Sequence, residues 1–227
     1  MSQAKPDESQ VRRGRQFDRL VNFTDAIVAV AITVLVLPIV ELRPKVGEET
    51  VWDVVGDNSA QLITFIFTFV IVSVMWRIHN RIFGRLDGFD GKIFWLNLAW
   101  LLLIVLLPWS SLMYGTGMDS LRAITSDTSW FSGGEGLGGA GLLYWSNLAA
   151  ISILGGFIST HARRNPELIS PDAPTEWIAS PLVLTRGFVF GTYMLFIGVM
   201  SVVIPHVAVW LPFGFFFVGY FLRKQEA

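Results

Sequence analysis

The first long apolar segment of the chain carries the residues whose types and spacing could do chemistry inside a membrane. Arg19 and Asp25 stand at its entrance, six residues apart, and Thr33 lies farther along it. Charged side chains at the entrance to such a segment are costly unless they are paired or have a function. A hydroxyl in the same segment can donate to or accept from water. These three residues therefore mark the candidate functional region.

Three branched apolar side chains follow one face of this segment. At 100° per residue, Val30, Val34 and Leu37 form a single helical stripe, Ile27 extends it inward, and Thr33 lies one step to the side. Such a stripe is usually a seam between packed helices. Copies of the seam around one axis would instead make a narrow apolar pore, which can gate by dewetting. The periodicity alone leaves both interpretations open.

The composition indicates an integral membrane protein. Hydrophobic residues make up 52% of the 227 residues and charged residues only 15%, whereas soluble domains carry about 25% charged residues. The chain has no cysteine, which excludes disulfides, thiolate metal sites and a cysteine nucleophile. The three histidines have no metal-ligand spacing, and the motifs of nucleophile elbows, Walker loops and zincins are missing. We therefore predict neither an enzyme nor a bound metal or cofactor.

Six segments approach the ~20 residues that a helix needs to cross a bilayer. We therefore expect an all-α fold with one domain of six transmembrane helices over residues 17–223. We expect a disordered cytoplasmic tail over residues 1–16 and a short cytoplasmic end over residues 224–227. The predicted spans are Leu20–Val40, Leu62–Ile78, Ile93–Trp109, Leu142–Ile158, Leu182–Ile204 and Val207–Leu222.

The basic residues predict the orientation of these spans. Of the 17 lysines and arginines, only Arg43, Lys45 and Arg122 lie on the side of the 1–2 and 3–4 connections. Because cytoplasmic loops carry an excess of lysine and arginine, both termini are predicted to be cytoplasmic. The protein should then be a multi-pass protein of the inner (plasma) membrane. The same rule explains the arginines beside the membrane, so nothing favours a nucleic-acid partner.

The two outer connections have distinct compositions. The 3–4 connection contains a glycine run over residues 133–141 that lacks the Gly-Lys-Ser/Thr ending of a phosphate loop, and we expect a flexible loop there. On the fifth span, the spacing of Gly187 and Gly191 permits a close approach between helices. The 1–2 connection is acidic, and it either concentrates cations near an outer mouth or is an ordinary solvated loop. Its acidic residues are Glu41, Glu48, Glu49, Asp53 and Asp57.

Polar residues of three spans are predicted to meet near the cytoplasmic side. His79 ends the second span, Asn97 opens the third, and Arg19 and Asp25 open the first, so all lie at a similar depth. Asp25 could accept hydrogen bonds from His79, Asn97 or Arg19, which would offset the cost of burying it. The group is either a structural network that fixes the helices or a proton relay through Asp25 and His79.

Three motifs in the first half of the chain resemble the transmembrane protein 175 family of potassium channels. Thr24 stands where the family usually has serine, and it keeps the hydroxyl. The second half is similar only in the number and character of its spans. The motifs are Arg19-x-x-x-Phe23-Thr24-Asp25 with Ala31-Ile32-Thr33-Val34-Leu35, then Trp76-x-x-His79-x-x-x-Phe83, and Leu96-Asn97-x-x-Trp100-Leu101 through Pro108.

This resemblance implies a passive, potassium-selective channel that is a homotetramer of six-helix subunits in the lipid bilayer. Bacterial single-repeat members resemble this chain in size, and the first helices of their subunits line the pore. The carbonyl filter of ordinary potassium channels is absent from the family and from this sequence. The resemblance places an apolar constriction at Val30, Val34 and Leu37, and ties Thr33 to potassium preference. It places Arg19, Thr24, Asp25, His79 and Asn97 in the supporting polar network.

One departure and one alternative accompany this resemblance. The family usually has isoleucine or leucine at the first constriction position, and the smaller Val30 predicts a wider ring and weaker preference for potassium over sodium. The alternative function is a proton-coupled ion transporter using Asp25 and His79. Such carriers commonly show internal repeats with broken helices at the midplane, and we detect neither in the sequence.

Overall fold

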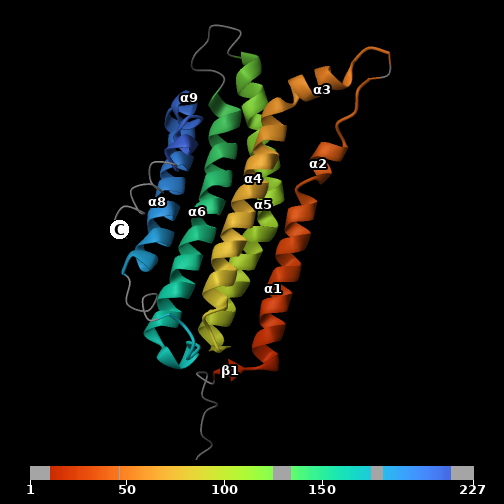
Figure 1. The fold of residues 1–227 in the computed structure, drawn as a ribbon. Coiled ribbons are helices and arrows are strands. Elements are labelled where there is room, and N and C mark those ends of the chain that lie inside the picture. Colours follow the sequence, from red (N-terminus) through yellow and green to blue (C-terminus); the bar gives the residue numbers. More distant parts are fainter. Residues whose placement is uncertain (1–10, 46, 125–133, 175–180, 216–227) are drawn as a thin grey trace, which may run out of the picture.

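The computed structural model describes residues 11–45, 47–124, 134–174 and 181–215, which form a bundle of long helices (Figure 1). A helix satisfies its own backbone hydrogen bonds, as a chain in lipid must. Within the described residues, five helices are long and apolar enough to cross a membrane: Arg15–Val40, Ser59–Phe83, Gly91–Asp119, Leu137–Arg164 and Arg186–Val203.

The elements follow one another in chain order with short connections. They are β1 (Arg12–Arg13), α1 (Arg15–Val34), α2 (Leu37–Val40), α3 (Val51–Asp57), α4 (Ser59–Phe83), β2 (Gly88–Phe89), α5 (Gly91–Ile124), α6 (Gly134–Arg164), η1 (Pro166–Leu168), α8 (Pro181–Val203), α9 (Pro205–Ala208) and η2 (Leu211–Gly214).

The first predicted span contains a break. Helix α1 ends at Val34, two turn residues follow, and α2 continues to Val40 with Pro38 near its start. Pro38 has no N–H to donate, and its ring would clash with the carbonyl of Val34 if the helix continued regularly. Pro108 acts differently, because α5 passes through it and continues beyond the predicted end at Trp109. Membrane helices tolerate proline where neighbouring helices hold them, and Pro108 is buried.

The prediction of a flexible glycine loop is wrong from Gly134 onward, because that part of the run forms the start of α6. These glycines allow close packing instead. A Cβ atom at Gly141 would lie 2.5 Å from the Cβ atom of Ser201 on α8. The predicted close approach at Gly187 is confirmed, since a Cβ atom there would lie 3.0 Å from the Cα atom of Gly156 on α6.

Two further predictions fall partly outside the described residues. The predicted sixth span, Val207–Leu222, overlaps α9 and η2 and then continues past Phe215. The predicted tail over residues 1–16 is described only from residue 11. Its described part is ordered, because β1 lies within it and α1 already begins at Arg15.

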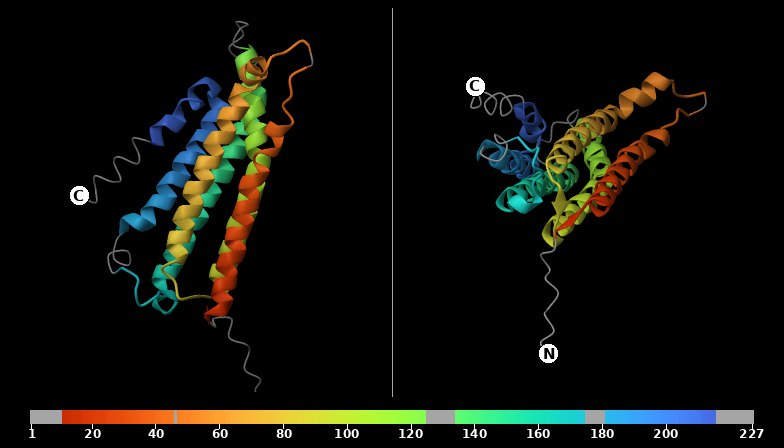
Figure 2. Two further views of the ribbon diagram at one scale, coloured as in Figure 1. Left: turned by 45° about the vertical axis from the view of Figure 1, so that its right-hand side comes forward. Right: turned by 60° about the horizontal axis from the view of Figure 1, so that its bottom comes forward.

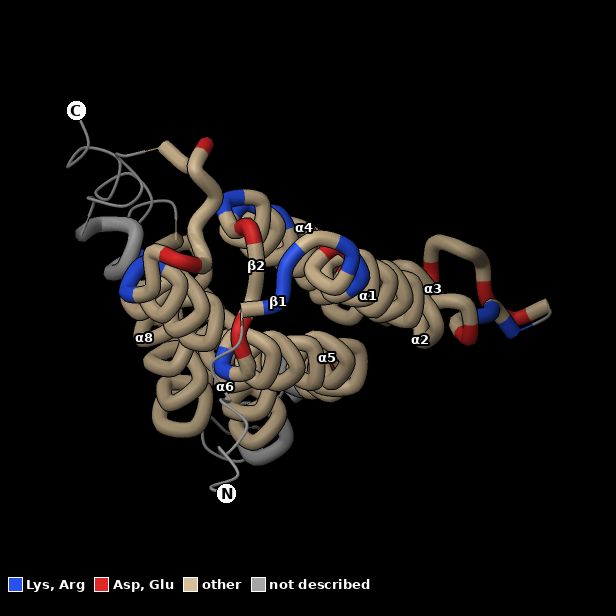
Figure 3. Tube along the Cα trace, turned by 90° about the horizontal axis from the view of Figure 1, so that it is seen from below, with Lys and Arg blue, Asp and Glu red and all other residues tan. Residues whose placement is uncertain are grey.

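The strands β1 and β2, together with η1, form one end of the bundle, which we call the basic end. The strands are antiparallel, with Arg12 opposite Phe89 and Arg13 opposite Gly88. Only glycine fits at position 88 without a shift, since a Cβ atom there would lie 2.8 Å from the carbonyl oxygen of Arg12. The guanidinium of Arg13 donates to the carbonyl of Glu167 at 2.7 Å. Figure 3 shows lysine and arginine gathered at this end.

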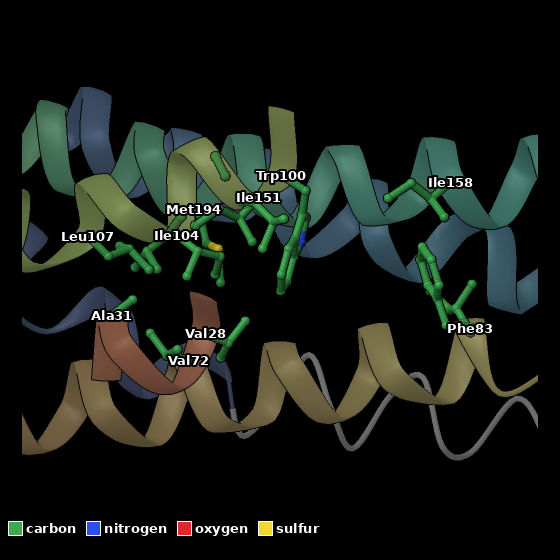
Figure 4. Packing of buried hydrophobic residues seen from close by; sticks show 14 of the residues in the cluster. Val28, Ala31, Val72, Phe83, Trp100, Ile104, Leu107, Ile151, Ile158 and Met194 are labelled. Carbon is green, nitrogen blue, oxygen red and sulfur yellow. The ribbon is translucent and has the colours of Figure 1, made fainter. Parts of the chain in front are cut away.

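Helix α1 lies at the edge of the bundle (Figure 2) and packs against α5 and, less extensively, α4. Helix α6 packs between α5 and α8. The main apolar core joins these helices, and in Figure 4 Val28 and Ala31 of α1 lie beside Val72 of α4 and near Ile104 of α5. The bundle therefore covers one side of α1 and leaves the other side open.

Candidate functional site

The two sides of α1 differ sharply in exposure. The covered side carries Leu20, Thr24, Val28 and Ala31, which are all buried. The open side carries the predicted stripe: Val30 is 62% exposed, Val34 37% and Leu37 54%, and Thr33 is also exposed. The stripe is therefore not a packing seam inside the subunit. Another molecule must cover it, and the candidates are lipid, water with ions, or further copies of the chain.

Thr33 is the hydroxyl-bearing residue of this open face. Its Oγ1 atom donates to the carbonyl of Val30 one turn earlier, at 2.7 Å. A threonine hydroxyl has one proton to donate and two lone pairs to accept with. Because the backbone takes the proton, the lone pairs remain on an exposed oxygen beside an apolar stripe. Such an oxygen can accept a hydrogen bond from water or contact a cation.

A chain of hydrogen bonds ties the covered side of α1 to two other helices. The amide of Asn97 on α5 donates to Thr24 Oγ1 at 2.8 Å, and the Asn97 Oδ1 atom lies 2.9 Å from His79 Nε2 on α4. Thr24 in turn donates to the carbonyl of Leu20 at 2.9 Å. Asn97 and His79 are 1% and 4% exposed. The chain of bonds fixes the rotation of α1 about its axis and so decides which side faces outward.

Two aromatic rings, one from its own helix α4 and one from α5, hold His79 in place. Its ring stacks on Phe83 with centroids 4.3 Å apart and on Trp100 of α5 at 4.2 Å. Phe83 also stacks on Phe17 near the start of α1, at 6.1 Å. These contacts restrict the imidazole to the orientation in which it meets Asn97. They also leave little room for it to turn toward another partner.

Asp25 has a partner that the sequence reasoning did not anticipate. We predicted acceptance from His79, Asn97 or Arg19, but the Asp25 Oδ1 atom accepts from Trp76 Nε1 at 2.8 Å. Arg19 is exposed on the open side of α1. Trp76 precedes His79 by one turn on α4, and its indole N–H can only donate. That spacing was visible in the sequence and could have suggested the bond.

The predicted polar network thus consists of two separate parts in the structure. Thr24, Asn97 and His79 form a buried chain, whereas Asp25 bonds to Trp76 beside it, and among the described residues Asp25 and His79 share no hydrogen bond. Within the described ranges, no three of histidine, cysteine, aspartate and glutamate lie together as a metal-binding group. These hydrogen bonds orient α1, and α1 presents an outward apolar face that carries the hydroxyl of Thr33.

The motifs and this geometry lie in the part of the chain that matches a known family. Residues 19–108 match the family model described as endosomal/lysosomal potassium channel TMEM175. This part of the chain is similar to the TMEM175 family. The match runs from Arg19 in α1 through the first half of α5 and includes each residue of the predicted site. The family description is that of an ion channel and not of an enzyme.

Curated TMEM175 relatives match mainly over this first half. A zebrafish (Danio rerio) relative, named endosomal/lysosomal proton channel TMEM175, is 28% identical over 106 residues, which are 47% of this chain and 20% of that protein. A Streptomyces collinus relative named potassium channel is 29% identical over 105 residues, covering 46% and 50%. The match thus spans half or less of these two relatives. A Chamaesiphon minutus relative, also named potassium channel, is 25% identical over 217 residues, covering 92% and 95%.

A solved structure matches the chain along nearly its whole length. It is the crystal structure of a lysosomal potassium-selective channel TMEM175 homolog from Chamaesiphon minutus, with a TM-score of 0.65 and 20% identity. The match covers 94% of this chain and all of that one. The likeness shows that the two proteins share a fold, including the second half that the motifs did not cover.

Proposed function

We propose that the chain is a subunit of a homotetrameric, potassium-selective channel whose pore is lined by the open side of α1. The observation that carries the proposal is the exposure of the stripe at Val30, Val34 and Leu37 on the side turned away from the bundle. Four copies placed with these sides toward one axis would cover the stripe with one another. The potassium-channel names of the bacterial relatives support the same assignment.

Conduction through this pore would depend on how easily an apolar ring holds water. Constrictions lined by apolar side chains gate by dewetting. Val30 and Val34 would form rings of small branched side chains, and the exposed oxygen of Thr33 would offer a lone pair between them to an ion or its hydration water. The chain would then act without a cofactor, as a passive pathway in the plasma membrane.

A proton-coupled transporter through Asp25 and His79 is the second candidate. The proton-channel names of the animal relatives support proton movement in those proteins, although a channel is not a coupled exchanger. The geometry favours it less, because His79 bonds to Asn97 and is stacked between rings, while Asp25 bonds to Trp76. A unitary current through single proteins would support the channel, whereas saturable exchange driven by a pH gradient would support the transporter.

A flux assay in liposomes tests the pore at Val30. Val30→Asn places a polar side chain at the proposed constriction, so we expect faster potassium flux and weaker preference over sodium, because a polar ring stays hydrated. Val70→Asn on α4 is the matched control, since Val70 has the same side chain and is 53% exposed on another helix. Unchanged flux and selectivity in Val30→Asn would remove Val30 from the pore. The mass of the detergent-solubilised complex tests the tetramer.

A further inference from the structure

The short helix α3 and the groove beside it are not used by the proposed pore. The helix lies between the 1–2 connection and α4, at the end of the bundle opposite β1 (Figure 1). Its start is closed by a capping box, in which the Thr50 hydroxyl and the Asp53 backbone and carboxylate bond reciprocally, with the shortest bonds at 2.7 Å. Local bonds therefore form α3, and its apolar side chains remain free for another role.

The apolar side of α3 is unusually exposed. Trp52 is 80% exposed and Val51 64%, whereas the acidic residues Asp53 and Asp57 lie on the other side of the helix. The polarity thus separates as in amphipathic helices that lie along a membrane surface. The helix leads directly into α4, so it lies at the level where that span ends. Tryptophan is enriched at this level, because its ring is apolar and its N–H is polar.

An apolar groove of about 160 Å³ runs beneath α3. Leu42 and Pro44 of the 1–2 connection line one side, Val54 and Val55 of α3 the other, and Leu62 of α4 the floor. Apolar side chains are covered more favourably by hydrocarbon than by water. The chemistry of the groove therefore selects a hydrocarbon chain as its occupant.

The groove is continuous with surface that faces lipid. Ile63, directly after Leu62, and Ile66, one turn farther along α4, are 64% and 60% exposed on a candidate membrane span. Both lie within about one turn of the lining residue Leu62, so the groove borders an exposed apolar surface of α4. The occupant is therefore expected to come from the surrounding leaflet.

The segment that lines the groove carries a positively charged residue that can meet a headgroup. Arg43 is exposed and lies between the lining residues Leu42 and Pro44 in the chain. Among the described residues it has no hydrogen bond or ion pair, whereas its neighbour Lys45 is paired with Glu49 at 3.1 Å. A guanidinium matches the geometry of a phosphate with two parallel hydrogen bonds.

We propose that this groove is a binding site for one phospholipid of the adjoining leaflet. The acyl chain fills the groove, the phosphate contacts Arg43, and Trp52 lies beside it in the interfacial layer. The site anchors the connection between the first two spans to the membrane. The proposal holds whether or not α1 lines a pore, since it depends only on α4 crossing the bilayer.

Spin labelling tests the position of α3, because the chain has no cysteine to compete with an introduced one. A nitroxide at Trp52→Cys, in vesicles of dioleoyl phosphatidylethanolamine and phosphatidylglycerol, should collide more with oxygen than with a water-soluble nickel complex. The control Asp57→Cys, on the polar side of α3, should show the opposite preference. If the label at Trp52→Cys collides with the nickel complex as often as the label at the control position, α3 lies in water. Shielding from both reagents would indicate a second copy of the chain there. Either result overturns the proposal.

Retention of lipid tests the groove itself. Native mass spectrometry of protein released from the same vesicles should show bound phospholipid. Arg43→Gln should weaken retention about tenfold, as expected for loss of one charge-assisted hydrogen bond. Leu62→Trp fills the groove and should abolish retention, whereas Val74→Trp, 51% exposed on the same helix but away from the groove, should leave it unchanged. Equal retention in wild type, Arg43→Gln and Leu62→Trp would refute the site. Arg43→Gln decides the matter alone if the bulkier variant does not fold.

Discussion

Replacing Asn97 by leucine removes the side chain that joins three helices while keeping a similar volume. Asn97 is 1% exposed; its amide donates to Thr24 at 2.8 Å, and its Oδ1 atom lies 2.9 Å from His79 Nε2. The change breaks both bonds and leaves a ring nitrogen of His79 buried without this partner. We therefore expect Asn97→Leu to destabilise the subunit and to loosen α1.

The expected loss follows from the two bonds. Two hydrogen bonds at ~0.5–1.5 kcal/mol each give ~1–3 kcal/mol in the free energy of unfolding. Bonds between membrane helices average about 0.6 kcal/mol, which favours the lower half of that range. The bond to Thr24 can be measured separately with Thr24→Val, because that variant removes the same bond from its other end. The double variant should lose ~0.5–1.5 kcal/mol less than the sum of the single variants.

The assay is reversible unfolding by sodium dodecyl sulfate in dodecyl maltoside micelles, followed by circular dichroism of the helices. Asn97→Leu, Thr24→Val and the double variant complete the cycle with the wild type. If the two single losses add to within ~0.3–0.5 kcal/mol, the residues do not interact. That result would refute the reasoning that a bond between Asn97 and Thr24 sets the rotation of α1.

Two further outcomes can be measured on the purified protein. Gly141→Ala should lower the thermal midpoint and cost ~1–3 kcal/mol by overpacking, because its Cβ atom would lie 2.5 Å from that of Ser201. The control Gly139→Ala, whose Cβ atom would have nothing within 4 Å, should be neutral or stabilising. Equal effects of the two variants would contradict close packing of α6 and α8. Burial raises the pKa of Asp90, but the bonds it accepts from the α5 backbone and from His161 (2.7 Å) lower it more, below its usual value of 3.8. Its stabilising contribution is therefore present above pH 3.8 and lost as the pH falls through the lowered pKa. The free energy of unfolding, measured from pH 3 to 6, should depend less on pH in Asp90→Asn than in the wild type. An unchanged pH profile would exclude a stabilising bond between Asp90 and His161.

The sequence by itself determined the class of the protein and most of its spans. Long apolar segments with few charges dictate helices in a membrane, because lipid satisfies no backbone polar group. The same reading placed His79 and Asn97 at one depth, the resemblance added Thr24 to their network, and the structure joins the three by hydrogen bonds. The motifs around Arg19 and Asp25 indicated the resemblance to the TMEM175 family, since they combine polar residue types that apolar segments rarely hold.

Helix ends and individual partners were beyond the reach of the sequence. The glycine run at 134–141 has the composition of a loop, yet it forms helix and packs against α8, where Ser201 leaves no room for a Cβ atom at Gly141. The partner of Asp25 also depended on tertiary placement, because several donors lay at the same depth and only the rotation of α4 selects Trp76.

The stripe at Val30, Val34 and Leu37 shows most clearly which features follow from the sequence and which from tertiary packing. Periodicity placed the three residues on one face of a helix, but a stripe facing the core and a stripe facing outward have the same spacing. Only the tertiary structure decides between them, because α5 and α4 cover the opposite side of α1, which carries Val28 and Ala31. The sequence therefore determined that a stripe exists, and the packing of the other helices determined that it is open.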